Sequence, residues 1–256
     1  MAREFNGTNE YLEIDSAALT GVPISIACWF DSDSVGTNQV IVCLVDKARE
    51  SQYMGLGAWG GSGGDPVYAF VRDNGATAGA YSTTGYSADT WHHVLGVFSA
   101  VDDRRIYLDG GSKGTNATSR TPTGLDRMSI GRLGDSSPSA YFNGGVAEVA
   151  IWNAALTDDE AAILAKGYSP LFVRPQSLVA YWPLIRDTDD DIVGSYNMTP
   201  TNGPTVAPHP AVLYPVSPQM GEQQPLGPVA TGVFQMGAFK GAQRGVPATR
   251  MRRDYG

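Results

Sequence analysis

Short runs of alternating or continuous apolar residues recur along the first 185 residues of the chain. Apolar and polar positions alternate clearly in Trp91–Phe98 and in Arg105–Asp109, which predicts strands with one buried face and one face toward water or a second sheet. Many such runs, bounded by turn residues, are typical of a β-sandwich. The predicted strands are Tyr11–Ile14, Ile24–Phe30, Val40–Val45, Tyr53–Ala58, Val67–Arg72, Trp91–Phe98, Arg105–Leu108, Arg127–Ile130, Gly145–Trp152 and Ser177–Pro183.

Turn-forming residues separate these strands. Glycine adopts backbone conformations with positive φ that other residues avoid, and Asn and Asp favour the same turns. The chain has 31 glycines and 16 prolines, which favours many turns and little helix. The clearest turn sequences are Asp73-Asn74-Gly75, Asp109-Gly110-Gly111, Pro122-Thr123-Gly124 and Asn143-Gly144-Gly145.

One short helix is predicted after the strand that ends at Trp152. Thr157 is followed three residues later by Glu160, the spacing of a capping box, and an alanine-rich run continues to Lys166. Gly167 fits the position just beyond the helix C-terminus. We expect this helix to pack on the edge or the end of the sandwich.

The character of the sequence changes at about residue 200. Residues 201–256 hold eight of the 16 prolines, eight glycines and scattered apolar residues, and they carry a net charge of +3 against −8 for the whole chain. We predict a sandwich over residues 1–199 and an extended basic tail over 200–256 that docks on an acidic surface, such as neighbouring copies of the chain. The alternative is a solvated tail whose charge is incidental. The residues expected to dock the tail are Phe234, Phe239, Lys240, Arg244, Arg250, Arg252 and Arg253.

Composition limits the classes of function. Hydrophobic residues make up 42% of the chain, enough for a sizeable core, and the net negative charge argues against nucleic acid as a partner. No apolar run is long enough to span a membrane, and the residues after Met1 do not form a secretory signal, so we expect synthesis in a cytoplasm. Cys28 and Cys43 lie in apolar runs and are predicted to be buried free thiols, which can face each other on neighbouring strands.

Several stretches follow one another in a recognisable order. Phe5-Asn6-Gly7-Thr8 opens the stretch that ends at Ile14, and Trp91-His92-His93-Val94 precedes Tyr107-Leu108-Asp109-Gly110. Tyr141-Phe142-Asn143-Gly144 and Ile151-Trp152-Asn153 come later. In this order, over residues 5–185, the chain resembles laminin G-like domains of the concanavalin A-like lectin/glucanase superfamily, of the kind found in phage structural proteins. The resemblance implies an all-β fold, a two-sheet antiparallel jelly-roll sandwich, to which the sequence adds one short helix and an extended C-terminal tail.

The chain departs from its relatives at two places. Ala147 stands where relatives often have Asp before the Glu-Val pair, which puts any metal or polar network that uses that Asp in doubt. The strand Ser177–Pro183 comes last, whereas many relatives have a similar strand first, and it is expected to close a sheet beside the N-terminal strand.

The aromatic and histidine residues of the strands are predicted to be structural. Large rings such as Trp91, Trp152 and Trp182 are natural core fillers. His92 and His93 are adjacent, so their side chains point to opposite faces of a strand and do not readily share a ligand or a proton.

The superfamily includes glucanases, so hydrolysis needs to be tested against the residues. The resemblance implies that such enzymes carry Glu-x-Asp-x-x-Glu on one strand, which aligns two carboxylates in a cleft. Glu13-Ile14-Asp15 begins this pattern, but Ala18 replaces the second Glu. We therefore predict no catalytic residues and no enzymatic activity.

Calcium remains open as a ligand. Asp187, Asp189 and Asp191 have the alternate spacing that begins a calcium loop, but Ile192 and Met198 replace the glycine and the terminal glutamate of such a loop. A solvated acidic turn is the favoured interpretation. Relatives often hold calcium with loop oxygens and backbone carbonyls, which leave little trace in a sequence, so no metal ligands are predicted.

A carbohydrate site is predicted around a tryptophan in a glycine-rich loop. Trp59 and Asp65 bracket the sequence Gly-Gly-Ser-Gly-Gly, and an exposed flat ring suits stacking on the face of a sugar. The alternative is a tryptophan tucked under the loop as a hydrophobic plug, and the sequence leaves both open.

Together these features favour a non-enzymatic structural protein of a phage virion, made in the host cytoplasm. It would serve as a capsid decoration, cement or head–tail component, displaying the lectin-like sandwich and anchored by its tail to other virion proteins. The alternative is a carbohydrate-binding adhesin module on a phage fibre or a cell surface, with cell-surface glycans as partners.

Overall fold

The computed structural model describes residues 1–61, 63–185 and 188–215 of the 256-residue chain. All seven residues predicted to dock the tail, from Phe234 to Arg253, lie outside the described residues.

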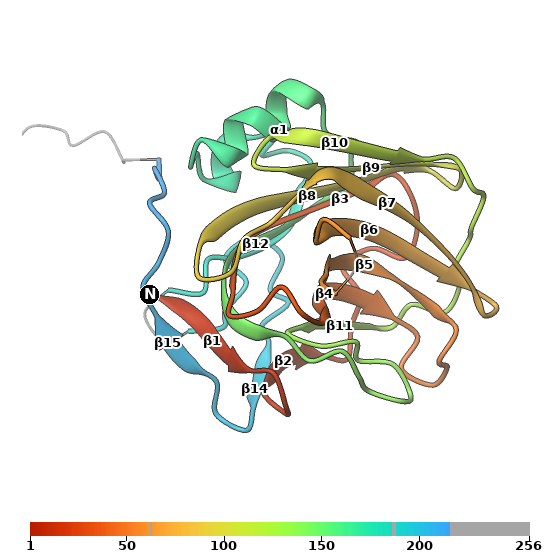
Figure 1. The fold of residues 1–256 in the computed structure, drawn as a ribbon, viewed down its shortest axis with the longest axis horizontal. Coiled ribbons are helices and arrows are strands. Elements are labelled where there is room, and N and C mark those ends of the chain that lie inside the picture. Colours follow the sequence, from red (N-terminus) through yellow and green to blue (C-terminus); the bar gives the residue numbers. More distant parts are fainter. Residues whose placement is uncertain (62, 186–187, 216–256) are drawn as a thin grey trace, which may run out of the picture. The chain divides into compact units, whose positions relative to one another are not determined.

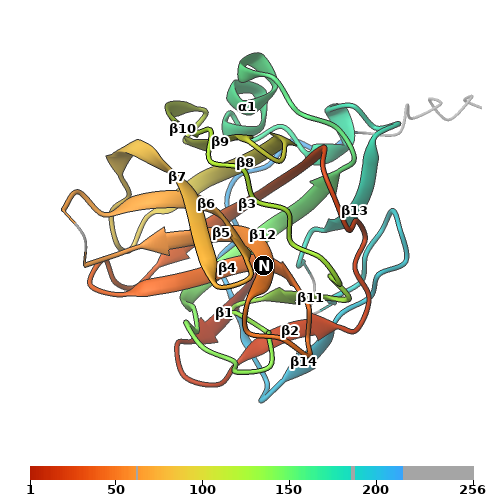
Figure 2. The same cartoon turned by 90° about the vertical axis from the view of Figure 1, so that its right-hand side faces the viewer.

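The described residues confirm the all-β jelly-roll sandwich: two antiparallel sheets packed face to face (Figure 1, Figure 2). Across the eight-stranded sheet the order is β10 (Gly111–Asn116), β9 (Asp103–Leu108), β8 (Trp91–Ala100), β3 (Ile24–Ser32), β12 (Asn143–Trp152), β1 (Ala2–Asn6) and β15 (Thr205–Ala207), and β13 (Leu178–Trp182) also pairs with β12. Across the seven-stranded sheet the order is β14 (Thr199–Thr201), β2 (Tyr11–Ile14), β11 (Arg127–Ile130), β4 (Asn38–Val45), β5 (Gln52–Trp59), β6 (Pro66–Asp73) and β7 (Ala76–Gly85).

Hydrophobic side chains pack in three clusters. The largest fills the space between the sheets and includes Phe30, Leu56 and Trp182. A second covers the outer face of the eight-stranded sheet beneath helix α1 (Asp158–Ala165) and the 3₁₀ helix η1 (Pro170–Phe172). The third lies on the outer face of the seven-stranded sheet. Since both faces of β4 are covered, its sequence is a continuous apolar run instead of an alternating one.

Helix α1 forms as its sequence predicts. The Thr157 side chain accepts a hydrogen bond from the Glu160 amide, and the Glu160 carboxylate accepts one from the Thr157 amide, so the capping box is complete. Gly167 follows the helix with φ of +84°, which favours glycine. The helix lies beside β8 and β10 (Figure 1).

The sandwich extends beyond residue 199, where the predicted tail begins. β14 pairs with β2 in one sheet and β15 pairs with β1 in the other, so residues 199–207 run alongside the N-terminal strands. These pairs form because two short polar strands find free sheet edges, which the weak apolar pattern of this segment does not reveal. The strand β13, which we expected beside the N-terminal strand, pairs with β12 instead.

Residues 208–215 then cross the outer face of the eight-stranded sheet, and we call them the C-terminal strap. Leu213 exchanges backbone hydrogen bonds with Gly167 and Ser169. Glu148, 2% exposed and with φ of +56°, accepts hydrogen bonds from the hydroxyls of Tyr181 and Tyr214. The strap is therefore fixed to the sandwich by a buried carboxylate next to Ala147.

His209 adds to this attachment. Its Nε2 lies 3.2 Å from Glu148 Oε1, and its two ring nitrogens face the carbonyl oxygens of Pro210 and Pro183. Burial works against the charged ring, but the hydrogen bonds to Glu148 and to the two carbonyls outweigh it and raise the pKa of His209. A protonated His209 thus holds the strap most firmly.

Two further expectations need correction. Cys28 and Cys43 are buried free thiols, but they lie in different sheets, on β3 and β4, and do not face each other on neighbouring strands. Trp152 and Trp182 fill the core, whereas Trp91 is partly exposed because it points outward over Gly145 at the surface of the eight-stranded sheet.

Candidate functional site

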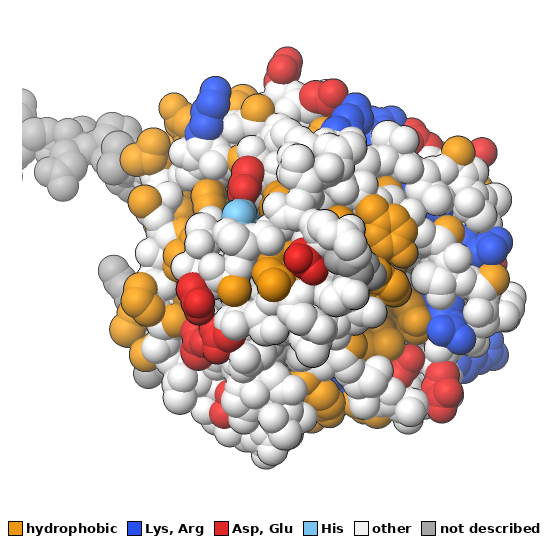
Figure 3. Space-filling view, in the orientation of Figure 1, with side chains coloured by type: hydrophobic (Ala, Val, Ile, Leu, Met, Phe, Trp, Pro, Cys, Tyr) orange, Lys and Arg blue, Asp and Glu red, His pale blue; other side chains and the backbone are white. Residues whose placement is uncertain are grey.

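The most distinctive surface is the outer face of the seven-stranded sheet over β4 to β7. Alternation on β5 directs Met54, Leu56 and Ala58 inward and Tyr53 and Trp59 outward. On β6 the same alternation directs aromatic rings and one arginine outward. Figure 3 shows hydrophobic side chains gathered over these strands, with basic side chains beyond them.

Glycines on β5 and β7 make room for the rings. A Cβ at Gly57 would lie 2.4 Å from the ring of Tyr68, which is opposite it on β6. On β7 the ring of Tyr81 lies over Gly79 of the same strand, where a Cβ would be 3.2 Å from the ring. Small residues between large ones therefore let the rings lie across neighbouring strands.

Three rings form what we call the aromatic platform: Trp59, Tyr68 and Tyr81. Tyr68 and Tyr81 stack with their centroids 5.7 Å apart and their planes 8° from parallel. Trp59 packs nearly perpendicular to both tyrosine rings, with its ring centroid 4.9 Å from that of Tyr68 and 5.7 Å from that of Tyr81. Tyr68 is buried, but Tyr81 is 41% exposed and Trp59 is partly exposed, so the platform presents an apolar surface to solvent.

The loop of residues 131–142 forms a wall beside the platform and creates a groove. Leu133 and Ala140 from this loop complete a hollow of about 370 Å³ over the sheet. A second hollow of about 220 Å³ continues from it and shares Tyr53, Arg72 and Leu133 with the first. The remaining lining of the second hollow is polar: Glu50, Asp135, Ser137 and Ser139.

Charged groups are placed at the junction and at the polar end. Arg72 Nη1 donates a long hydrogen bond of 3.4 Å to the Tyr53 hydroxyl, and Arg72 Nε is buried without a partner among the described residues. Asp135 is only 3% exposed and accepts a hydrogen bond from the Ser137 amide. Burial raises the pKa of Asp135, and the charge of Glu50 adds to the rise.

The structure brings one of the two predicted sugar-binding residues to this groove. Trp59 is neither a free ring nor a plug, since it packs against two tyrosines and keeps part of its surface open. Asp65 lies in the loop between β5 and β6, where its carboxylate accepts a hydrogen bond from the Gly61 amide, and it does not line the groove.

Acidic residues considered for calcium are engaged elsewhere. Asp187 lies outside the described residues, whereas Asp189 and Asp191 are buried, so these two are not the solvated residues that the sequence predicted. Asp189 pairs with Arg3, and Asp191 accepts backbone hydrogen bonds from residues on both sides of its turn. Within residues 1–61, 63–185 and 188–215, no three His, Cys, Asp or Glu side chains are grouped so that they could hold a metal ion.

The carboxylates that begin the glucanase pattern are ion-paired. Glu13 receives Arg132 Nη2 at 2.5 Å, and Asp15 receives Arg127 Nε at 2.7 Å. These contacts join β2 to β11 and to the chain beyond it, which is a structural use of both groups.

His92 lies between Ser87 and Asp109. Its Nε2 is 3.0 Å from Ser87 Oγ, and its Nδ1 is 2.8 Å from Asp109. The Ser87 amide also points at Nε2, at 3.1 Å, so a backbone donor already engages the lone pair that a general base would need. We interpret this array as a clasp between the loop that precedes β8 and the turn that joins β9 to β10. His93 faces the opposite way, and burial lowers its pKa to about 4.

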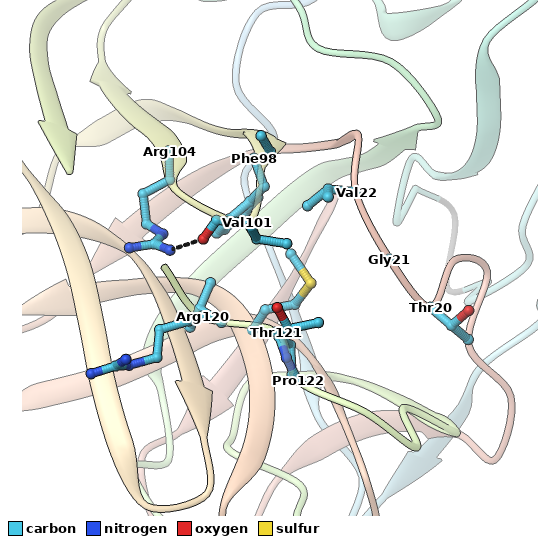
Figure 4. Close-up of a pocket in the computed structure, with 12 residues that line it drawn as sticks. Thr20, Gly21, Val22, Phe98, Val101, Arg104, Arg120, Thr121 and Pro122 are labelled. Atoms are coloured by element: carbon cyan, nitrogen blue, oxygen red, sulfur yellow. Dashed lines mark hydrogen bonds between the residues drawn. The ribbon is translucent and has the colours of Figure 1, made fainter. Parts of the chain in front are cut away.

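A smaller cavity of about 60 Å³ lies at one end of the sandwich (Figure 4). Its lining is largely apolar, and Arg104 at its rim donates hydrogen bonds to the Val101 and Thr118 carbonyls. It has room for only a few water molecules. The groove is therefore the candidate site.

None of the described helices is long and apolar enough to cross a membrane.

Comparisons with known proteins agree with this fold. A family model of the laminin G type, described as the concanavalin A-like lectin/glucanases superfamily, matches residues 6–162. No curated protein matches the chain in sequence.

Three solved structures illustrate the likeness. A candidate carbohydrate-binding protein from Bacteroides ovatus aligns with a TM-score of 0.54 and 20% identity over 80% of this chain and 59% of that one. The CBM40 of Ruminococcus gnavus IT-sialidase, bound to α2,3-sialyllactose, aligns with a TM-score of 0.53 and 12% identity over 64% of this chain and 96% of that one. Domain 4 of AbnA, an extracellular arabinanase from Geobacillus stearothermophilus in complex with arabinotriose, aligns with a TM-score of 0.52 and 16% identity. The alignment covers 63% of this chain and 75% of that one. At these identities the likeness concerns the fold.

Proposed function

Because the chain belongs to the concanavalin A-like lectin/glucanases superfamily, we propose that it is a carbohydrate-binding module whose site is the groove over β4 to β7. One observation carries the proposal: a partly exposed platform of Trp59, Tyr68 and Tyr81 lies in a groove whose other end is polar.

The chemistry of sugars suits this arrangement. A sugar ring has an apolar face of C–H groups, which packs on an aromatic ring, and a rim of hydroxyls, which both donate and accept hydrogen bonds. Apolar and aromatic walls with a few placed polar groups are the usual form of small-ligand sites, and the larger hollow falls within the roughly 300–1,000 Å³ that such sites occupy. The groove offers both kinds of contact within one continuous surface.

Two of the similar structures support the choice of ligand class. They hold arabinotriose and sialyllactose, so sandwiches of this fold present surfaces that bind oligosaccharides. The particular groups in this groove come from this chain alone.

The proposal is tested by binding of the full chain to a glycan array, with Tyr81→Ala and Tyr168→Ala as a matched pair. Both tyrosines are 41% exposed, but only Tyr81 belongs to the platform. We expect Tyr81→Ala to lower the signal on bound glycans about tenfold, because the sugar loses half of its apolar contact. Tyr168→Ala should leave the signal unchanged. Equal losses in both variants, or no bound glycan for the wild type, would contradict the proposal.

We propose further that residues 216–256 attach this module to a larger assembly, with a phage virion as the candidate. The strap leads to Pro215 on the outer face of the eight-stranded sheet, whereas the groove lies on the outer face of the other sheet (Figure 1). A tether that starts at this point would leave the groove open. The Pro/Gly-rich composition and the five basic residues of the segment support attachment to an acidic surface.

A truncated chain that ends at Pro215 separates the two roles. We expect it to keep the glycan binding and the melting temperature of the full chain, because β14, β15 and the strap remain. It should be lost from assembled particles. Incorporation at full occupancy would refute the tether, and a fall in melting temperature would show that the truncation damages the sandwich instead.

A further inference from the structure

The distribution of charge along the groove indicates what kind of sugar it takes. We propose, resting on the proposed glycan-binding function, that the groove binds an uncharged oligosaccharide of at least two sugar units. One unit lies on the aromatic platform and the next lies between Arg72 and Asp135.

The need for two units follows from the division of the groove. The hollow over the platform is lined mainly by rings and aliphatic side chains, and the second hollow by charged groups and serines. Arg72, Tyr53 and Leu133 line both, so the surface is continuous between them. A single sugar that lies over the rings leaves the polar hollow empty, whereas two linked sugars can occupy both hollows.

The preference for an uncharged ligand follows from the polar end. Among the lining residues, one guanidinium, Arg72, stands against two carboxylates, Glu50 and Asp135. The charge of Arg132 also acts on Asp135, but Arg132 is already paired with Glu13. Neither carboxylate forms an ion pair with Arg72, and no salt bridge to Arg72 is found among the described residues. A sugar carboxylate or sulfate would gain one cation but would meet two like charges, one of them almost fully buried, where screening is weak.

Hydroxyl groups match the same atoms well. Among the described residues, the Arg72 guanidinium that lines this hollow makes one long hydrogen bond, from Nη1 to the Tyr53 hydroxyl, and Asp135 has bonded only one carboxylate oxygen, Oδ1, to the Ser137 amide. A hydroxyl can accept from Arg72 and donate to Asp135, so a pair of neighbouring hydroxyls would satisfy both groups without adding charge.

The test is isothermal titration of the full chain with paired ligands. Each neutral gluco-, galacto-, manno- or xylo-oligosaccharide is compared with its uronate or sulfated counterpart, at lengths from one unit to four. For the neutral sugar that binds best, we expect affinity at least tenfold above that of its charged counterpart. We also expect a gain of at least tenfold from one unit to two.

Neutralising the carboxylates tests the cause of the preference. In Glu50→Gln/Asp135→Asn the advantage of the neutral ligand should shrink to less than threefold, while Glu10→Gln/Asp102→Asn, whose two acidic residues lie outside the groove, should keep it. Burial and Glu50 raise the pKa of Asp135 against the opposing effects of the Ser137 amide, Arg72 and Arg132, so lowering the pH through this pKa should weaken binding of the neutral ligand to the wild type, because protonation replaces a charged acceptor with a weaker neutral one.

The outcomes separate the inference from the proposed function. Tighter binding of a uronate or sulfate, or equal affinity for one unit and two, would overturn the inference while leaving glycan binding in place, since Trp59→Ala would still lower the affinity. A preference that survives in Glu50→Gln/Asp135→Asn would also overturn it. Absence of binding to every sugar would contradict the proposed function itself.

Discussion

Replacing Trp59 with alanine is expected to lower the affinity for the best glycan by about ten- to a hundredfold, which corresponds to about 1.4–2.8 kcal/mol. Trp59 ends β5 at the groove and braces both Tyr68 and Tyr81 with its edge. The substitution therefore removes one apolar surface and loosens the two rings that remain. Titration of the wild type and the variant with the same oligosaccharide measures the change.

Trp91→Ala is the matched control for this prediction. Trp91 is also partly exposed at the start of a strand, but it lies on the eight-stranded sheet over Gly145, away from the groove. Its replacement should leave glycan affinity within twofold. If both tryptophan variants lose affinity together, the effect comes from the fold; if neither does, the platform is not the binding surface.

Tyr81 shows what the sequence alone conceals about the site. The sequence indicates Trp59 through its glycine-rich surroundings, but it does not indicate β7, whose alanines, threonines and glycines have no strong apolar alternation. Tyr81 reaches the platform because β7 pairs with β6 and places it opposite Tyr68. The sequence does contain one signal for the platform. Tyr68, Phe70 and Arg72 alternate along β6, which predicts that their side chains share one face of the strand.

The polar end of the groove depends on contacts that periodicity does not encode. Asp135 stands in a loop that the sequence marks only as polar, yet it is buried because residues 131–142 fold back over the sheet. The strands, the capped helix and the two-sheet architecture, by contrast, follow from local patterns of side chains and turns. Local sequence patterns therefore predict the strands, the helix and the two sheets, whereas the groove depends on contacts between residues far apart in the sequence.

The sequence also does not reveal the role of Asp189, because its spacing from the neighbouring aspartates resembles a calcium loop while its partner in the fold is Arg3. Arg3 Nε donates to Asp189 Oδ1 at 2.7 Å and Arg3 Nη2 to Oδ2 at 2.9 Å, and both side chains are nearly buried. This two-point contact joins β1 to the loop that follows β13, 186 residues apart in the sequence. It also places a charged pair where water cannot compensate for the loss of one member.

Arg3→Ala is therefore expected to destabilise the sandwich by about 3–5 kcal/mol, because Asp189 would be left charged and unpaired in the interior. Urea denaturation measures the loss as a lower midpoint. Arg3→Met combined with Asp189→Leu should recover most of it, since the buried charge is then gone. Arg105→Ala, which breaks the more exposed contact with Asp103, should cost less than about 1 kcal/mol. Similar losses of stability for Arg3→Ala and Arg105→Ala would show that the buried pair does not hold β1 to the loop after β13.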